Sequence, residues 1–74
     1  MKSVTVVNVL EMVGVSPDGF QEAVREAILE ARNTVQGISG VEVVNLTADV
    51  RNDDIVQYKA NVKVAFTADH GGVR

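Results

Sequence analysis

The stretch SPDGFQEAVREAILEARNTVQ, residues 16–36, decides the fold of this chain. It opens on Ser16, Pro17 and Asp18, which are typical of a helix start: serine caps free amides, proline fits the first turn, and aspartate favours the positive end of the helix dipole. Apolar residues then recur at spacings of three and four, which predicts an amphipathic helix beginning at Ser16: Phe20, Val24, Ala27, Ile28, Ala31 and Val35. A helix with one apolar face needs a sheet to pack against.

Leu29 lies outside this apolar stripe, on the polar side of the predicted helix with Arg25 and Arg32. A single exposed leucine is ordinary on a protein surface, and this interpretation is favoured. The alternative is a contact with another subunit.

Length and composition restrict the class of protein. A chain of 74 residues forms one small domain, which buries little apolar surface and needs a disulfide, a metal or self-association. The absence of cysteine removes the disulfide and any thiolate metal site. With no membrane-length apolar run and no signal-peptide pattern, we expect a cytoplasmic protein without a membrane partner. A net charge of −3 without a Lys/Arg cluster argues against a nucleic-acid partner.

Three segments read as strands: 2–13, 41–50 and 55–67, the last two joined by the polar turn 51–54. The first strand is apolar on both faces, with Leu10 and Met12 on one side and Val7, Val9 and Val13 on the other. One helix covers only one face of a sheet, so the second apolar face predicts a further partner.

The third strand alternates between apolar and polar residues, and we expect its apolar side to pack on the helix: Val56, Tyr58, Ala60, Val62, Val64 and Phe66. This alternation also sets the hairpin register. The expected pairs are Val50 with Val56, Ala48 with Tyr58, Leu46 with Ala60, and Val44 with Val62. A helical crossover leaves its flanking strands parallel, so the third strand fits between them, antiparallel to both. The prediction is an α+β fold, β-α-β-β with sheet order 1-3-2, in a single domain 1–67 followed by a disordered tail 68–74.

Residues suited to catalysis are scarce. The only histidine, His70, falls in the predicted tail, and the glycines match no phosphate-binding spacing, so no enzyme is expected. Asp53 and Asp54, with Asp49 nearby, could bind Ca²⁺ or Mg²⁺ through oxygen, but the spacing is not that of an EF-hand and a solvated hairpin turn is the better interpretation.

Two other carboxylates are tentative metal ligands. Asp18 is first a partner of the helix dipole and second a ligand shared between subunits. Glu11 stands within an apolar strand, so an assembly that covers this face must give it a cation or a hydrogen-bond donor. A structural charge pair is the favoured interpretation for Glu11, and an ion or ligand contact is the alternative.

Three segments together resemble the dodecin family: VLEMVGVSPDGF at 9–20, ISGVEVV at 38–44 and YKANVKVAF at 58–66. The resemblance covers about residues 2–67. It implies a β-α-β-β protomer whose sheet wraps one helix, and twelve copies forming a hollow homododecamer of tetrahedral symmetry. It also implies flavin pairs bound at subunit contacts, where a tryptophan stacks on the isoalloxazine and a glutamine hydrogen-bonds its edge.

The chain departs from this pattern at both flavin positions. Gly40 stands at the position of the tryptophan and Lys59 at that of the glutamine, and the chain has no tryptophan at all. We therefore expect a non-enzymatic, homo-oligomeric shell that binds a small molecule or an ion, calcium or magnesium, without tight flavin binding. The alternative is a flavin storage and sequestration protein in which Lys59 contacts a flavin phosphate.

Overall fold

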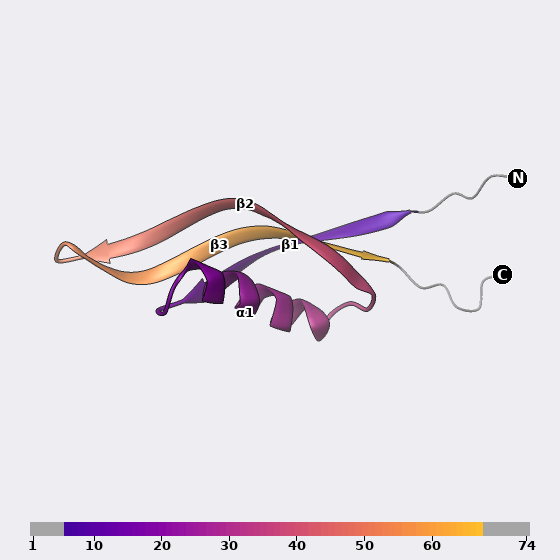
Figure 1. Cartoon of the computed structure of the whole chain (residues 1–74), viewed down its shortest axis with the longest axis horizontal. Coiled ribbons are helices and arrows are strands. Elements are labelled where there is room, and N and C mark those ends of the chain that lie inside the picture. Colours follow the sequence, from indigo (N-terminus) through magenta and orange to yellow (C-terminus); the bar gives the residue numbers. More distant parts are fainter. Residues whose placement is uncertain (1–5, 68–74) are drawn as a thin grey trace, which may run out of the picture.

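The computed structural model describes residues 6–67, and the chain folds as one sheet with one helix (Figure 1). The elements follow in the order β1 (Val7–Ser16), α1 (Phe20–Arg32), β2 (Ile38–Arg51) and β3 (Asp54–Thr67). The sheet is antiparallel with strand order β1-β3-β2, and α1 lies across one of its faces. These features confirm the predicted α+β fold and its 1-3-2 order. The predicted tail, His70 and residues 2–5 of the predicted first strand lie outside the described residues.

The helix starts later than predicted. Ser16 is the last residue of β1, and its buried hydroxyl accepts a hydrogen bond from the Asp18 amide at 3.0 Å. Serine can bond in this way to the backbone two residues on, and this bond closes a local turn instead of capping a helix. The N-cap is Gly19, without a side-chain cap, and α1 runs from Phe20. The prediction of a helix start at Ser16 is therefore wrong.

The helix also ends before Val35, the last residue of the predicted apolar stripe. The last helical residue is Arg32, and Asn33 and Thr34 close a turn by donating to the carbonyls of Glu30 and Ala31. Gly37, at φ 72°, then turns the chain into β2.

The core consists of small side chains. Fully buried hydrophobic residues come from one stripe of α1 and from the helix-facing side of β3: Ala23, Ala27, Ala31, Ala60, Val62 and Val64. Leu10, Met12 and Tyr58 pack partly buried at its border. The predicted helix-facing side of the third strand is thus confirmed, whereas Ala23 was absent from the predicted stripe. Because no fully buried side chain among residues 6–67 is larger than valine, this part of the protomer gains little from its own core.

The helix approaches β1 at a glycine. Gly14 is buried opposite Ala60, and a Cβ built on it would overlap the carbonyl oxygen of Ala23 and lie 3.0 Å from the Cβ of Ala27. Next to this contact the rings of Phe20 and Tyr58 meet edge to face, with centroids 4.8 Å apart. Glycine and alanines therefore set the distance between α1 and the sheet.

The hairpin register was predicted correctly at its centre and wrongly at two places. Leu46 pairs with Ala60 and Ala48 with Tyr58, as expected. Val50, however, pairs with Ile55 instead of Val56, and Val62 pairs with Val43 instead of Val44, because the ladder is shifted on both sides of this centre. Each shift inserts an unpaired residue, which is the definition of a β-bulge.

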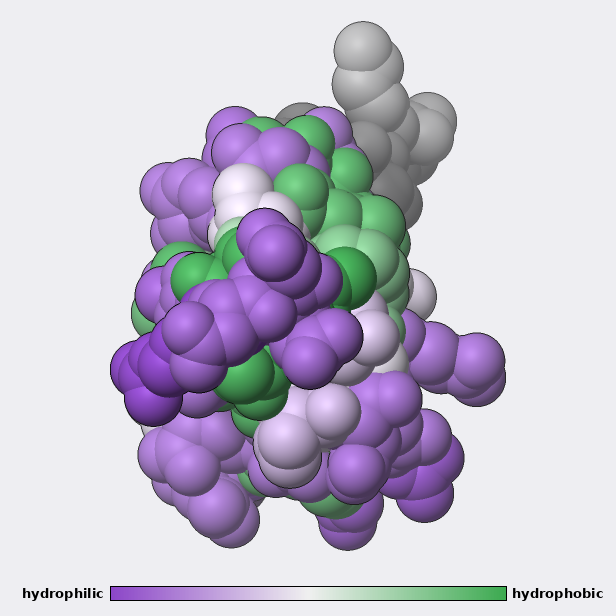
Figure 2. Space-filling model, turned by 90° about the vertical axis from the view of Figure 1, so that its left-hand side faces the viewer, coloured by the Kyte–Doolittle hydropathy of each residue, from purple (hydrophilic) through white to green (hydrophobic). Residues whose placement is uncertain are grey.

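The far part of the β2–β3 hairpin leaves the sheet. The last residue pair between β1 and β3 is Ser16 with Tyr58, so residues 49–57, the hairpin arm, form a two-stranded ribbon. The arm projects past the first turn of α1 (Figure 1), and Figure 2 looks at its end. It turns through Asn52 and Asp53, whose φ angles of 54° and 66° are those of a type I′ turn.

Candidate functional site

The face of the sheet turned away from α1, the open face, carries most of the predicted site residues. Alternation along β3 puts Lys59, Asn61, Lys63 and Ala65 there, since Ala60, Val62 and Val64 are buried under the helix. The β1 residues on this face include four valines that are 39% to 59% exposed: Val7, Val9, Val13 and Val15. The predicted second apolar face of the first strand is therefore present and uncovered in the protomer.

Gly40 lies on the open face near the start of β2. It pairs with Ala65, which in turn pairs with Val9, so the row across the three strands is small and apolar. A Cβ built on Gly40 would have no heavy atom within 4 Å, and its φ is not positive. Neither the backbone angle nor the space requires glycine at this position, and a larger side chain fits there.

Lys59 lies on the same face, in a row with Val15 and Thr47. Its Nζ is 3.3 Å from Oδ2 of Asp49, and the two side chains are 39% and 50% exposed. An exposed pair of this kind contributes between about 0 and 1 kcal/mol. The ammonium group thus has a carboxylate partner within its own chain.

Gly40 and Lys59 are too far apart to contact one small ligand within a single chain. Ala65, the partner of Gly40, is six residues from Lys59 along β3, which corresponds to roughly 20 Å at 3.4 Å per residue. A ligand that contacts both positions must therefore lie between copies.

The two tentative metal ligands lie in different places. Glu11 is on the open face opposite Lys63, which also pairs with Glu42, so one lysine stands between two glutamates. Asp18 lies exposed in the loop between β1 and α1. Within residues 6–67, no three acidic or histidine side chains gather in a way that could hold a metal ion. The described residues of one chain therefore offer no complete donor set for a metal ion.

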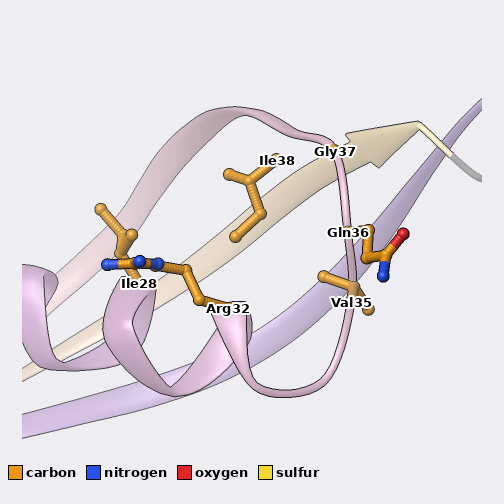
Figure 3. Close-up of a pocket in the computed structure, with 6 residues that line it drawn as sticks. All are labelled: Ile28, Arg32, Val35, Gln36, Gly37 and Ile38. Atoms are coloured by element: carbon orange, nitrogen blue, oxygen red, sulfur yellow. The ribbon is translucent and has the colours of Figure 1, made fainter.

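A groove on the helix was not predicted from the sequence. An open hollow of about 480 Å³, the α1 groove, is lined by Gln21, Val24, Arg25, Ile28, Leu29 and Arg32. It adjoins a second hollow of about 450 Å³, which Ile28 and Arg32 share with the loop into β2 (Figure 3). Leu29, 41% exposed, belongs to this groove. In the sequence, the residues that line the α1 groove form a second stripe at helical spacing, beside the buried stripe of α1.

The fold defines a small α+β protein with one helix on a three-stranded sheet and further apolar surface outside its core. A family model described as Dodecin matches residues 6–69. The chain belongs to the dodecin family, whose members are small binding proteins that form homo-oligomers. Among the residues described, no helix is both long and apolar enough to cross a membrane.

Solved dodecin structures are similar to this chain over nearly its whole length. Dodecin from Streptomyces coelicolor is 27% identical with a TM-score of 0.87, covering 95% of this chain and 100% of that one. Dodecin from Streptomyces davaonensis is 29% identical with a TM-score of 0.86, covering 92% and 100%. A calcium dodecin from Mycobacterium tuberculosis, described as a calcium chelating antigen with a novel calcium-binding site, is 25% identical with a TM-score of 0.76, covering 90% and 96%. A search of curated proteins found no match.

Proposed function

We propose that this chain forms a closed homododecameric shell that binds a small molecule or a metal ion at contacts between copies, without tight flavin binding. The observation that carries the proposal is the open position at Gly40, which offers no ring for stacking in a chain without tryptophan. Lys59, at the second flavin position, is paired with Asp49.

The small core supports the assembly. Fully buried hydrophobic residues in the described part of the chain are only alanines and valines, whereas large apolar side chains remain exposed on all three strands. Exposed apolar surface of this extent is typical of an interface, and association buries it with a gain of roughly 25 cal/mol per Å².

The residues at the flavin positions support weak flavin binding. Base–aromatic stacking contributes about 1–3 kcal/mol per contact in single-strand binders, a physical analogue of a flavin against an indole. Losing one such contact lowers affinity about 5- to 150-fold. Glycine has no side chain that could replace this stacking contact.

A fluorescence titration tests the flavin part of the proposal. Indole quenches stacked flavin by electron transfer, so riboflavin fluorescence is measured against the unmodified protein, Gly40→Trp, and Gly40→Trp with Lys59→Gln. We expect little quenching by the unmodified protein, partial quenching by the single variant and saturable quenching by the double variant. Gly40→Leu, which adds volume without an aromatic ring, is the control.

Two results would contradict this proposal. Tight quenching by the unmodified protein would favour the flavin storage alternative. An assembled double variant that binds no riboflavin would show that Gly40 and Lys59 do not decide flavin binding.

The metal part of the proposal rests on carboxylates shared between copies, with Glu11 and Asp18 as candidates. The calcium dodecin among the similar structures makes Ca²⁺ the ion to test first. Calorimetric titration of the oligomer with CaCl₂ is compared between the unmodified protein, Glu11→Gln and Asp18→Asn, with Glu22→Gln on the exposed side of α1 as control. Calcium binding that neither candidate variant weakens would remove both residues from the site.

A further inference from the structure

The hairpin arm has exposed apolar side chains and no third strand. Val50, Ile55 and Val56 in the arm are 63%, 49% and 41% exposed. An isolated two-stranded ribbon is marginally stable in water, and a third strand or a helix normally supports it. Figure 2 shows hydrophilic residues at the end of the molecule with hydrophobic residues exposed behind and beside them. The arm therefore has an apolar surface that its own chain leaves uncovered.

The α1 groove is complementary to the hairpin arm, because it is apolar and its charged residues are basic. Its floor is apolar, with Val24, Ile28 and Leu29, and the charged residues that line it are both basic, Arg25 and Arg32. The acidic residues of α1 do not line the groove: Glu22, Glu26 and Glu30. One side of the helix is thus apolar and basic.

The end of the arm carries the opposite charge. Asp53 and Asp54 are exposed at the turn, next to the exposed Ile55, and Arg51 is the only basic residue in the arm. We propose that the hairpin arm of one copy docks in the α1 groove of a second copy. Ile55 then packs on Leu29, and the aspartates face the two arginines of the groove.

The arm cannot occupy the groove of its own chain. It projects past the first turn of α1 (Figure 1), whereas the residues that line the groove are spread along the helix from Gln21 to Arg32. The contact joins two different surfaces. In a closed tetrahedral shell, which the proposed function assumes, it lies either around a three-fold axis, as a ring, or across a two-fold axis, as a reciprocal pair in which each arm enters the groove of the other copy.

Charge reversal tests the pairing. Arg25→Glu with Arg32→Glu should shift assembly to at least tenfold higher protein concentration in sedimentation velocity, and Asp53→Lys with Asp54→Lys should do the same. All four substitutions in one chain should restore assembly, since each copy supplies both surfaces. The matched control, Glu22→Lys with Glu26→Lys on the other side of α1, should leave it unchanged. If the fourfold variant instead loses as much assembly as the two double variants together, the proposed pairing is refuted.

Disulfide trapping supplies a second measurement that does not depend on charge. The chain has no cysteine, so Leu29→Cys with Ile55→Cys introduces one pair of thiols per copy. Mild oxidation should give covalent dimers on a non-reducing gel if the contact lies across a two-fold axis, and trimers as well if it lies around a three-fold axis. Glu26→Cys with Ile55→Cys should give neither.

The outcomes separate this contact from the proposed function on which it rests. A large oligomer without cross-links would refute the arm-in-groove contact and leave the shell intact. A cross-link within single chains would show the arm folded onto its own helix and refute it as well. A folded monomer at every concentration would refute both the contact and the shell.

Discussion

Gly14→Ala should destabilise the protein although it adds only one methyl group. The new Cβ would lie 2.9 Å from the carbonyl carbon of Ala23 and 3.0 Å from the Cβ of Ala27, and it would overlap the Ala23 carbonyl oxygen. Carbon atoms pack at about 3.5–4.0 Å, and two of these three neighbours are backbone atoms that no rotamer change can remove. The helix must therefore move away from β1.

The magnitude follows from two opposing effects. Overpacking a close contact costs about 1–3 kcal/mol, while replacing glycine by alanine restricts the unfolded chain and returns about 0.4–1 kcal/mol. The net loss is about 1–2 kcal/mol. For a chain of this length each kcal/mol shifts Tm by roughly 4–8 °C, so we expect Tm to fall by about 5–15 °C.

Gly40→Ala is the matched control for this measurement. A Cβ at Gly40 meets no heavy atom within 4 Å, so only the unfolded-state effect remains and Tm should stay or rise slightly. Thermal unfolding is followed by circular dichroism at one protein concentration, because the Tm of an oligomer depends on concentration. Equal Tm values for the two variants would refute the close approach of α1 to β1.

Two further substitutions test local features. Asn61→Val should keep or raise Tm, because the Asn61 Oδ1 is buried without a hydrogen-bond partner in the described chain; a fall in Tm would mean that a group from another copy uses this oxygen. Gly37→Ala should lower Tm by several degrees, because φ is 72° and the new Cβ would lie 3.0 Å from the carbonyl oxygen of Thr67; an unchanged Tm would show that this loop relaxes freely.

The strands and their order were predictable because their signals are local and periodic. The alternation along β3 identified the side that packs on α1, and the crossover argument placed β3 in the centre of the sheet. The open-face position of Lys59 followed from the same alternation. The three register shifts between β2 and β3 were not predictable, since no residue type marks them.

The helix boundary and the α1 groove depend on contacts that the sequence does not show. Ser16 has two ways to use its hydroxyl, and only the structure shows the bond that closes the turn at Asp18. Ala23 was absent from the predicted stripe because larger neighbours defined the pattern, yet its small side chain is fully buried in the core. The groove around Leu29 is lined by α1 side chains alone, and their helical spacing in the sequence does not show whether they leave a hollow between them.

The proposed function makes assembly and ligand binding one property. Gly40 and Lys59 lie roughly 20 Å apart along the strands, so in the proposed shell a small ligand that contacts both positions lies between copies. A ligand held there binds the assembled state and not the free chain. By mass action it stabilises the shell by about 2.7 kcal/mol when its concentration is 100 times its dissociation constant. A substitution that weakens the contacts between copies therefore lowers ligand affinity at the same time, even where it lies far from the ligand.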